Sequence, residues 1–367
     1  MSLDVTLQTD PGVILHDPVD EARRQVEICN ACRYCEGFCS VFPAITRDKV
    51  FADGDITQLA NLCHNCRGCY YACQYTAPHE FDLNLPAALA EARAESWERL
   101  AWPGGIAQMF QRHGTALAAA LVTGFALMIL AISALPGGGE GFYAWIGHTA
   151  MVAIFLPAFV LPLATLVVSL RRYWAEVGGT RITLADLHAA AISAGRMKNL
   201  DGGQGQGCNF EEGERFTNER RYAHQAVLWG FLLCFGATAA GTILHYVFDS
   251  PAPYGFFSVP KLLGVPGGIL LVIGCAGMLV LKSRSDPALG TPGRGSGEWA
   301  FVWLLGLVGL SGLLLYWLRD SVLTGPMLAL HLGSVLTFFL VTPYSKMAHG
   351  FYRFAALVRE AQAKDGR

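Results

Sequence analysis

The sequence predicts a mainly α-helical protein in which a small, cysteine-rich N-terminal domain precedes a bundle of six membrane-spanning helices. Two observations predict this class. Hydrophobic residues make up 53% of the 367 residues and charged residues only 15%, a composition that is unusual for a soluble protein. Eight of the 11 cysteines nevertheless lie within the first 73 residues, ahead of the apolar segments.

The eight cysteines form two copies of one spacing. The copies are Cys29, Cys32, Cys35, Cys39 and then Cys63, Cys66, Cys69, Cys73. This run is typical of [4Fe–4S] clusters, and in two-cluster ferredoxins the fourth cysteine of each run binds the other cluster. We therefore expect one cluster on Cys29, Cys32, Cys35 and Cys73, and a second on Cys63, Cys66, Cys69 and Cys39. The sequence thus predicts a helical, two-cluster ferredoxin-like domain over residues 1–85.

Zinc and disulfides are the other possible uses of these cysteines. Zinc sites usually take two cysteine pairs separated by a longer spacer, rather than four thiols within 11 residues. Met1–Pro11 has no basic stretch followed by an apolar one, so no export signal is visible there. We therefore expect the domain to face a reducing cytoplasm, where disulfides are rare.

The next segment, residues 86–112, mixes alanine with acidic and basic residues and contains Trp97, Trp102 and Phe110. Its composition predicts a linker helix between the two domains. An interfacial helix at the membrane surface and a solvated linker helix both fit this composition.

The membrane domain is expected over residues 113–352. A run of about 20 apolar residues is long enough to cross the hydrocarbon core of a bilayer. Runs of this kind occupy about 115–135, 142–170, 225–248, 262–281, 299–318 and 326–345. The predicted spans leave a cytoplasmic loop over 175–221 and a cytoplasmic tail over 353–367.

Basic residues predict the orientation of these spans, because cytoplasmic loops carry an excess of lysine and arginine. The segments 171–221, 282–298 and 346–367 hold nearly all the basic residues of the membrane domain, whereas the opposite loops offer only Lys261 and Arg319. Six spans then place both termini and the cysteine-rich domain on the cytoplasmic side. The expected location is a bacterial inner membrane, crossed several times.

Four histidines in the apolar segments predict a further metal centre, because an ionisable group inside a membrane is costly. His331 and His349 are 18 residues apart, so they share one face of a continuous helix, about 27 Å apart. His224 and His245 lie toward opposite ends of the third span. We pair His224 with His349 on the inner side and His245 with His331 on the outer side.

Such pairs are typical of b-type haem, in which two imidazoles reach one iron from opposite faces. The pattern predicts one or two haems. His148 and His113 are reserve ligands, and each histidine taken singly also fits a structural role. His64, beside Cys63, is expected to donate hydrogen bonds near a cluster.

Two further stretches carry a resemblance to known proteins. The segment from His331 to Leu336, followed by Thr342 to His349, resembles the haem-carrying helix of the nitrate reductase gamma-subunit type. The whole chain is more similar to the tricarballylate utilization protein B family, with supporting stretches at Gly207–Asn209, Tyr222–Gln225 and Leu244–Tyr246.

This resemblance implies a membrane electron carrier that reoxidises a separate FAD-dependent dehydrogenase, which converts tricarballylate to cis-aconitate. Electrons then reach quinone through the clusters and haem b. A related fusion protein in cobalamin biosynthesis has the same module. No glycine fingerprint for flavin follows a predicted strand here, so FAD is assigned to the partner.

In this interpretation the chain holds no residue that acts on the organic substrate. Nucleic-acid binding is not expected, and a homo-oligomer is compatible with the sequence. Two other functions are weighed against the relay. A tricarboxylate transporter predicts inverted repeats or broken helices, of which no convincing pair is visible. A membrane redox sensor predicts a signalling domain, and none follows the last span.

Overall fold

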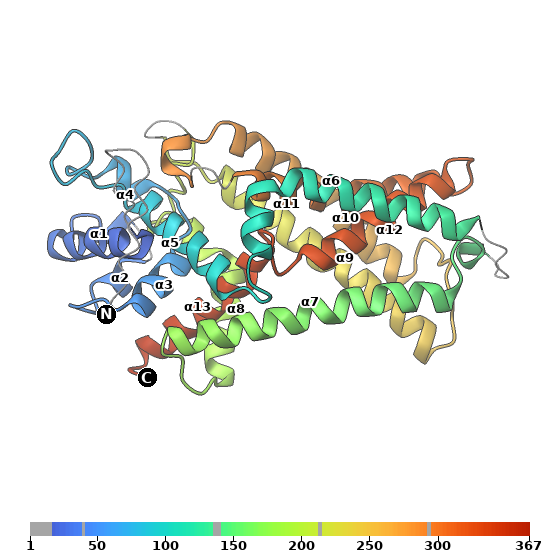
Figure 1. Ribbon diagram of the computed structural model, residues 1–367, viewed down its shortest axis with the longest axis horizontal. Coiled ribbons are helices and arrows are strands. Elements are labelled where there is room, and N and C mark those ends of the chain that lie inside the picture. The colour runs from blue at the N-terminus through green and yellow to red at the C-terminus, as the bar shows by residue number, and fades with distance from the viewer. Residues whose placement is uncertain (1–16, 39–40, 135–140, 212–214, 292–294) are drawn as a thin grey trace, which may run out of the picture.

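The computed structural model describes residues 17–38, 41–134, 141–211, 215–291 and 295–367, and within these ranges it is built from helices (Figure 1). Two isolated β-bridges are the β-structure of the described residues. The predicted mainly α-helical class is confirmed. The N-terminal helices are α1 (Pro18–Cys32), α2 (Phe42–Ile45), α3 (Asp53–Leu62), α4 (Gly68–Tyr71) and α5 (Leu85–Leu100).

The N-terminal domain is held together by α1, α3 and α5. The Asp17 side chain caps α1 by accepting a hydrogen bond from the Val19 amide at 2.8 Å, and Pro18 favours the first helical turn. Apolar side chains from the three helices fill the core, including Val26, Ile56 and Leu89. Burying such side chains is the main stabilising contribution in a small domain.

The linker expected as one helix over 86–112 is divided in the structure. Helix α5 ends at Leu100, and the next helix begins at Ile106. Pro103 and two glycines lie in the break, and Gly105 has a φ of 83°. Several side chains of α5 pack in the core of the N-terminal domain.

Within the described residues, six helices are long and apolar enough to cross a membrane, which agrees with the predicted count. Each overlaps one of the predicted ranges. They are α6 (Ile106–Ser133), α7 (His148–Glu176), α9 (Glu219–Val247), α10 (Val259–Ser283), α11 (Gly295–Trp317) and α12 (Thr324–Val341).

Helices α9 and α10 pack closely because small residues line their contact. A methyl group added at Gly230 would lie 2.5 Å from the Leu271 amide nitrogen, and one at Gly274 would lie 2.6 Å from the Val227 nitrogen. Contacts this short leave no room for a side chain. Glycine therefore allows the two backbones to approach, as is common between membrane helices.

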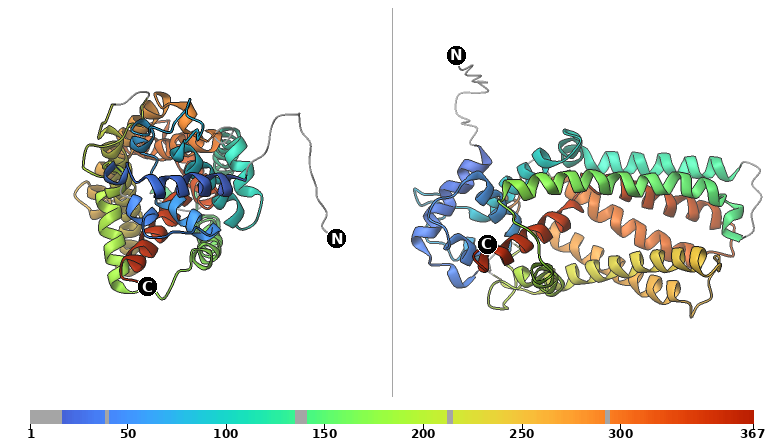
Figure 2. Two further views of the ribbon diagram at one scale, coloured as in Figure 1. Left: turned by 90° about the vertical axis from the view of Figure 1, so that its left-hand side faces the viewer. Right: turned by 90° about the horizontal axis from the view of Figure 1, so that it is seen from below.

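The N-terminal domain covers one end of the bundle (Figures 1 and 2). We call this the near end and the opposite one the far end. Helix α8 (Leu184–Arg196), in the segment between α7 and α9, also lies at the near end, as does α13 (Ala348–Lys364). Helix α13 packs on α3, α7 and α8, which joins the end of the chain to both domains.

His331 and His349 do not share one continuous helix, so that prediction is wrong. Helix α12 ends at Val341, and α13 begins only at Ala348. Pro343 lies between them, and proline both lacks an amide donor and disfavours helix at the preceding residue. The chain therefore leaves the bundle through turns before α13 starts.

Candidate functional site

Five cysteines line one pocket of the N-terminal domain, namely Cys29, Cys32, Cys35, Cys73 and, from the second run, Cys69. Cys29 and Cys32 lie in the last turn of α1, and Cys35 follows a left-handed turn at Arg33, whose φ is 55°. Cys73 reaches the same pocket from the segment after α4. The structure thus brings together the four residues that the crossed pairing assigns to one cluster. We call them the first cysteine group.

The thiols of this group influence one another. Burial raises the pKa of Cys29 to about 12, and the nearby Cys73, Cys35 and Cys32 contribute in the same direction. Burial and the nearby Cys73 and Cys32 raise the pKa of Cys35 to about 11. Iron binds the thiolate form, so assembly of a cluster here would release protons.

Cys63, Cys66 and Cys69 form the second cysteine group, and Cys39, their predicted fourth member, lies outside the described residues. Cys63 ends α3 and Cys69 lies in α4, with left-handed residues at Asn65 and Arg67 between them. Burial is the main cause that raises the pKa of Cys69. The nearby thiols of Cys66, Cys63, Cys29 and Cys35 raise it further. Cys69 therefore lies between the two groups.

Among the described residues, no three histidine, cysteine, aspartate or glutamate side chains are placed to hold a single metal ion. A [4Fe–4S] cubane needs a different arrangement, in which each of four thiolates binds one of the four irons. The four thiols of the first cysteine group line one pocket, together with Cys69, so the number and kind of ligands fit such a cluster.

The segment between α8 and α9 covers the second cysteine group, which the sequence did not predict. The Asn209 amide donates a hydrogen bond to the Cys66 carbonyl at 2.8 Å. Cys208 is buried with Cys66, Met197 and Leu200, and its thiol donates to the Leu200 carbonyl at 3.4 Å.

The Asn209 side chain is fully buried at 0% exposure, and both of its polar atoms lack a hydrogen-bond partner among the described residues. Its position is close to Gly68, because a methyl group there would lie 3.5 Å from the Asn209 Oδ1. An unpaired buried amide is costly. Asn209 is therefore placed to bond a group held by Cys66 and Cys69.

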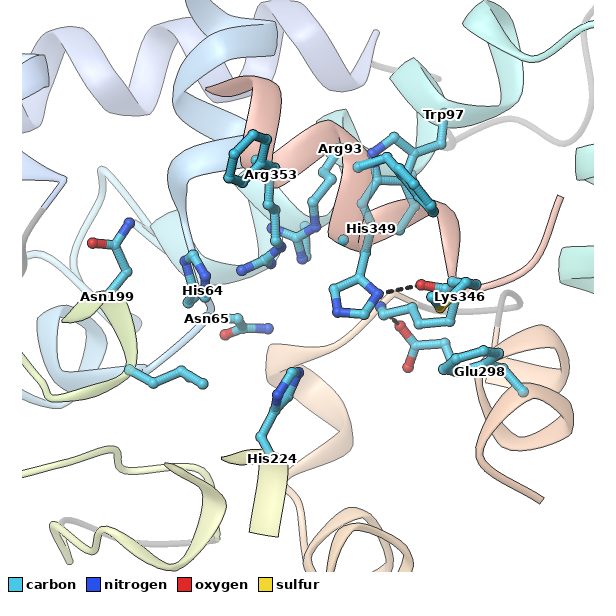
Figure 3. Close-up of a pocket in the computed structure, with 18 of the residues that line it drawn as sticks. His64, Asn65, Arg93, Trp97, Asn199, His224, Glu298, Lys346, His349 and Arg353 are labelled. Carbon is cyan, nitrogen blue, oxygen red and sulfur yellow. Dashed lines mark hydrogen bonds and ion pairs between the residues drawn. The ribbon is translucent and has the colours of Figure 1, made fainter. Parts of the chain in front are cut away.

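A cavity of about 1870 Å³ lies between the N-terminal domain and the near end of the bundle. We call it the near-end cavity. Side chains of α7, α9 and α11 give it an apolar wall, including Val167, Phe231 and Leu305. Its polar lining, seen in Figure 3, includes His64, Arg93, His224, Glu298, Lys346, His349 and Arg353.

His224 and His349 lie close together in this cavity, as the inner pairing predicts. Their ring centroids are 5.8 Å apart, with the ring planes at 80°. The Nδ1 of His349 is bonded to the Lys346 carbonyl, which leaves Nε2 available (Figure 3). Metal-bound histidines usually make such a bond through their other nitrogen.

Further observations are consistent with haem binding at these histidines. Burial, the nearby His224 and the positive charge of Arg353 lower the pKa of His349, which keeps its imidazole in the neutral form that binds metal. The buried Nδ1 of His224 has no partner among the described residues. The cavity volume also exceeds that of ordinary ligand pockets, about 300–1000 Å³.

The predicted outer pair differs in the structure. His245 stacks on His148, with centroids 4.9 Å apart, and His148 Nε2 lies 3.0 Å from the Tyr246 hydroxyl. His331 instead lies 3.1 Å from the Ser311 hydroxyl of α11. The far end therefore brings His245 together with the reserve residue His148 and not with His331, because α12 places His331 against α11.

His64 and His113 have different surroundings. His64 is directed into the near-end cavity (Figure 3), and its Nδ1 lies 2.8 Å from the Leu62 carbonyl. Burial and the charge of Arg353 lower its pKa. His113 is exposed at a kink in α6 and belongs to neither histidine pair.

Comparisons with known proteins agree with this architecture. Residues 107–367 match the family model described as Citrate utilization protein B, and residues 22–98 match that of the Citrate utilization protein B Fer4-like domain. The chain is 41% identical to Citrate utilization protein B of Escherichia coli over 357 residues, which is 96% of this chain and 94% of the relative. No solved structure matches. With this coverage of both chains, the protein belongs to the Citrate utilization protein B family.

Proposed function

We propose that the protein carries electrons from a soluble flavoprotein dehydrogenase to membrane quinone through two [4Fe–4S] clusters and b-type haem. The Fer4-like match to the N-terminal domain supports the iron–sulfur part of this proposal. When bound, the clusters and haem supply one-electron carriers. The chain itself provides thiolates, imidazoles and a protein path between them.

The main support for the proposal is that the loop of the second cysteine group and the histidine pair line the same cavity. His64 and Asn65, which lie between Cys63 and Cys66, line the same cavity as His224 and His349. Arg353 links the two sites, because it donates to the Cys63 carbonyl at 2.9 Å and lies near His349. A cluster on the second group is thereby separated from the histidine pair by a few side chains.

The partner is proposed to dock at the first cysteine group. Cys32 is exposed, and Tyr34 beside it is 64% exposed. From the family resemblance, we take the partner to be the FAD enzyme that oxidises tricarballylate to cis-aconitate. That oxidation removes two electrons and two protons from the substrate, and the flavin receives the electrons before this chain does.

The near end is proposed to face the cytoplasm of a bacterium. The basic segments 171–211, 215–221, 282–291 and 346–367 all lie at this end, together with the N-terminal domain (Figure 2). At the far end, Lys261 lies in the first turn of α10 and Arg319 follows α11. This charge difference supports the orientation that the positive-inside rule predicts.

The first experiment is anaerobic purification of the full chain from membranes, with iron, sulfide and haem measured per chain. Optical spectra before and after dithionite should show a sharp reduced b-haem band, and about eight cluster irons are expected from two cubanes. Clusters without haem would remove the histidine part of the relay. Absence of both would overturn the proposal.

A pair of variants tests the inner histidines. His349→Ala should remove or convert one low-spin haem signal, because the iron loses an axial imidazole. His113→Ala is the matched control, since His113 is exposed and belongs to neither pair. Unchanged haem spectra in both variants would exclude His349 as a ligand.

A further inference from the structure

Three arginines surround the backbone of residues 63–65 at the wall of the near-end cavity. Arg93 donates to the Ala60 and Cys63 carbonyls at 3.0 and 2.9 Å, and Arg353 donates to the Cys63 carbonyl at 2.9 Å. Arg220 donates to the Asn65 carbonyl at 2.8 Å. The three come from α5, α13 and α9, so the fold gathers positive charge here from both domains.

These arginines have no carboxylate partner among the described residues. Two acidic residues line the cavity, Asp286 and Glu298. Glu298 forms ion pairs with both Lys282 and Lys346, which neutralise it (Figure 3). Arg93 is only 5% exposed. Burying a guanidinium without a counter-charge is costly, so an anion at this position is favoured.

Two of the three guanidiniums have an N–H group without a partner among the described residues. The Nε atoms of Arg353 and Arg220 are buried and have no hydrogen-bond partner among the described residues. Figure 3 shows Arg353 and Arg93 on the side of the cavity that also carries His349. Guanidinium groups bind carboxylates strongly because their N–H groups match the two carboxylate oxygens.

We infer that Arg93, Arg220 and Arg353 form a carboxylate-binding seat for the propionates of a haem held by His224 and His349. This inference rests on the proposed function, since it requires haem in the near-end cavity. The carboxylates would add negative charge on the cavity side to that of the Cys63 thiolate, which lies near Arg93 and Arg353. They would also place the edge of the haem beside the backbone of the second cysteine group.

The test uses the purified full chain and compares Arg353→Gln and Arg220→Gln with Arg353→Lys. Loss of positive charge near the haem disfavours the reduced state, so both glutamine variants should lower the haem midpoint potential and retain less haem through detergent washing. Arg353→Lys should restore most of the potential. Arg99→Gln is the control, because Arg99 already pairs with Glu95 and Glu176.

Two outcomes would overturn the seat while leaving the relay intact. In the first, the haem midpoint potential and haem retention stay unchanged in both glutamine variants, but the midpoint potential of the second cluster changes. That result would assign the arginines to that cluster. In the second, added citrate binds wild-type protein and not Arg353→Gln, with the haem spectrum unaffected, which would assign the seat to a free carboxylate. Wild-type protein without any haem would instead contradict the proposed function.

Discussion

The two cysteine groups share one spacing but have opposite surroundings. In the first group Cys32 is exposed, and the neighbouring Tyr34 is exposed as well. In the second group Cys66 is 7% exposed and is covered by Cys208, Met197 and Leu200. Identical ligand spacing therefore does not produce equivalent sites, because segments far away in the sequence determine which group is covered.

The difference suggests a division of roles within the proposed relay. An exposed site suits exchange with a soluble partner, whereas a covered site beside the near-end cavity suits delivery toward the membrane. Burial and hydrogen bonds to sulfur both change the potential of a cluster. The second group can therefore be tuned by residues that the first group lacks.

The largest expected effect comes from removing one ligand in each group. Cys66→Ser should abolish the electron paramagnetic resonance signal of the second cluster and stop reduction of the haem by dithionite-reduced clusters at low mediator concentration. Cys32→Ser should remove the other signal and leave the second one in place. Two undiminished signals in either variant would show that its cysteine is not a ligand.

A medium effect is expected at Asn209, which touches only the second group. Asn209→Leu removes an amide donor next to Gly68, and a hydrogen bond to a charged acceptor is worth about 1.5–3 kcal/mol. Because that bond favours the more negative reduced cluster, the second-cluster potential should fall by tens of millivolts in a redox titration.

The first-cluster potential is the internal reference for Asn209→Leu, and Asn30→Leu is the matched control at the other group. Asn30 is half-buried and donates to the Asp48 carbonyl at 2.7 Å. An equal shift of both potentials in Asn209→Leu would indicate a general change of the domain instead of a local hydrogen bond.

The smallest effect requires no mutation. A water-soluble paramagnetic lanthanide chelate should speed the relaxation of the first-cluster signal more than that of the second, because Cys32 of the first group is the one exposed cysteine among the described residues. Signals assigned with Cys66→Ser and Cys32→Ser identify which cluster responds. Equal enhancement of both signals would contradict the difference in exposure.

Local patterns in the sequence were sufficient for much of this molecule. Apolar runs located the six spans, and the cysteine spacing located both groups, because each signal resides in consecutive residues. The pairing of His224 with His349 followed from topology alone. Pro343, in contrast, was a visible signal for the end of α12, and the assumption of a continuous helix through it misplaced His331 relative to His349.

Other features depend on contacts between distant segments and had no local signal. Asn209 meets Cys66 across more than 100 residues, and Arg353 meets Cys63 across an even longer separation. Nothing near Arg353 in the sequence distinguishes it from an ordinary basic residue of a tail. Such residues become identifiable only when the folded chain shows which buried groups lack partners.

Helix α13 also affects the order in which the protein can be completed during synthesis. Tyr352 stacks on Trp97, with centroids 6.1 Å apart, and the Ala356 carbonyl accepts a hydrogen bond from Gln58 at 2.9 Å. These contacts join the N-terminal domain to residues that the ribosome makes after all six spans. The contacts between the N-terminal domain and α13 can therefore form only after the membrane bundle has been translated. This order couples completion of the domain's core to membrane insertion.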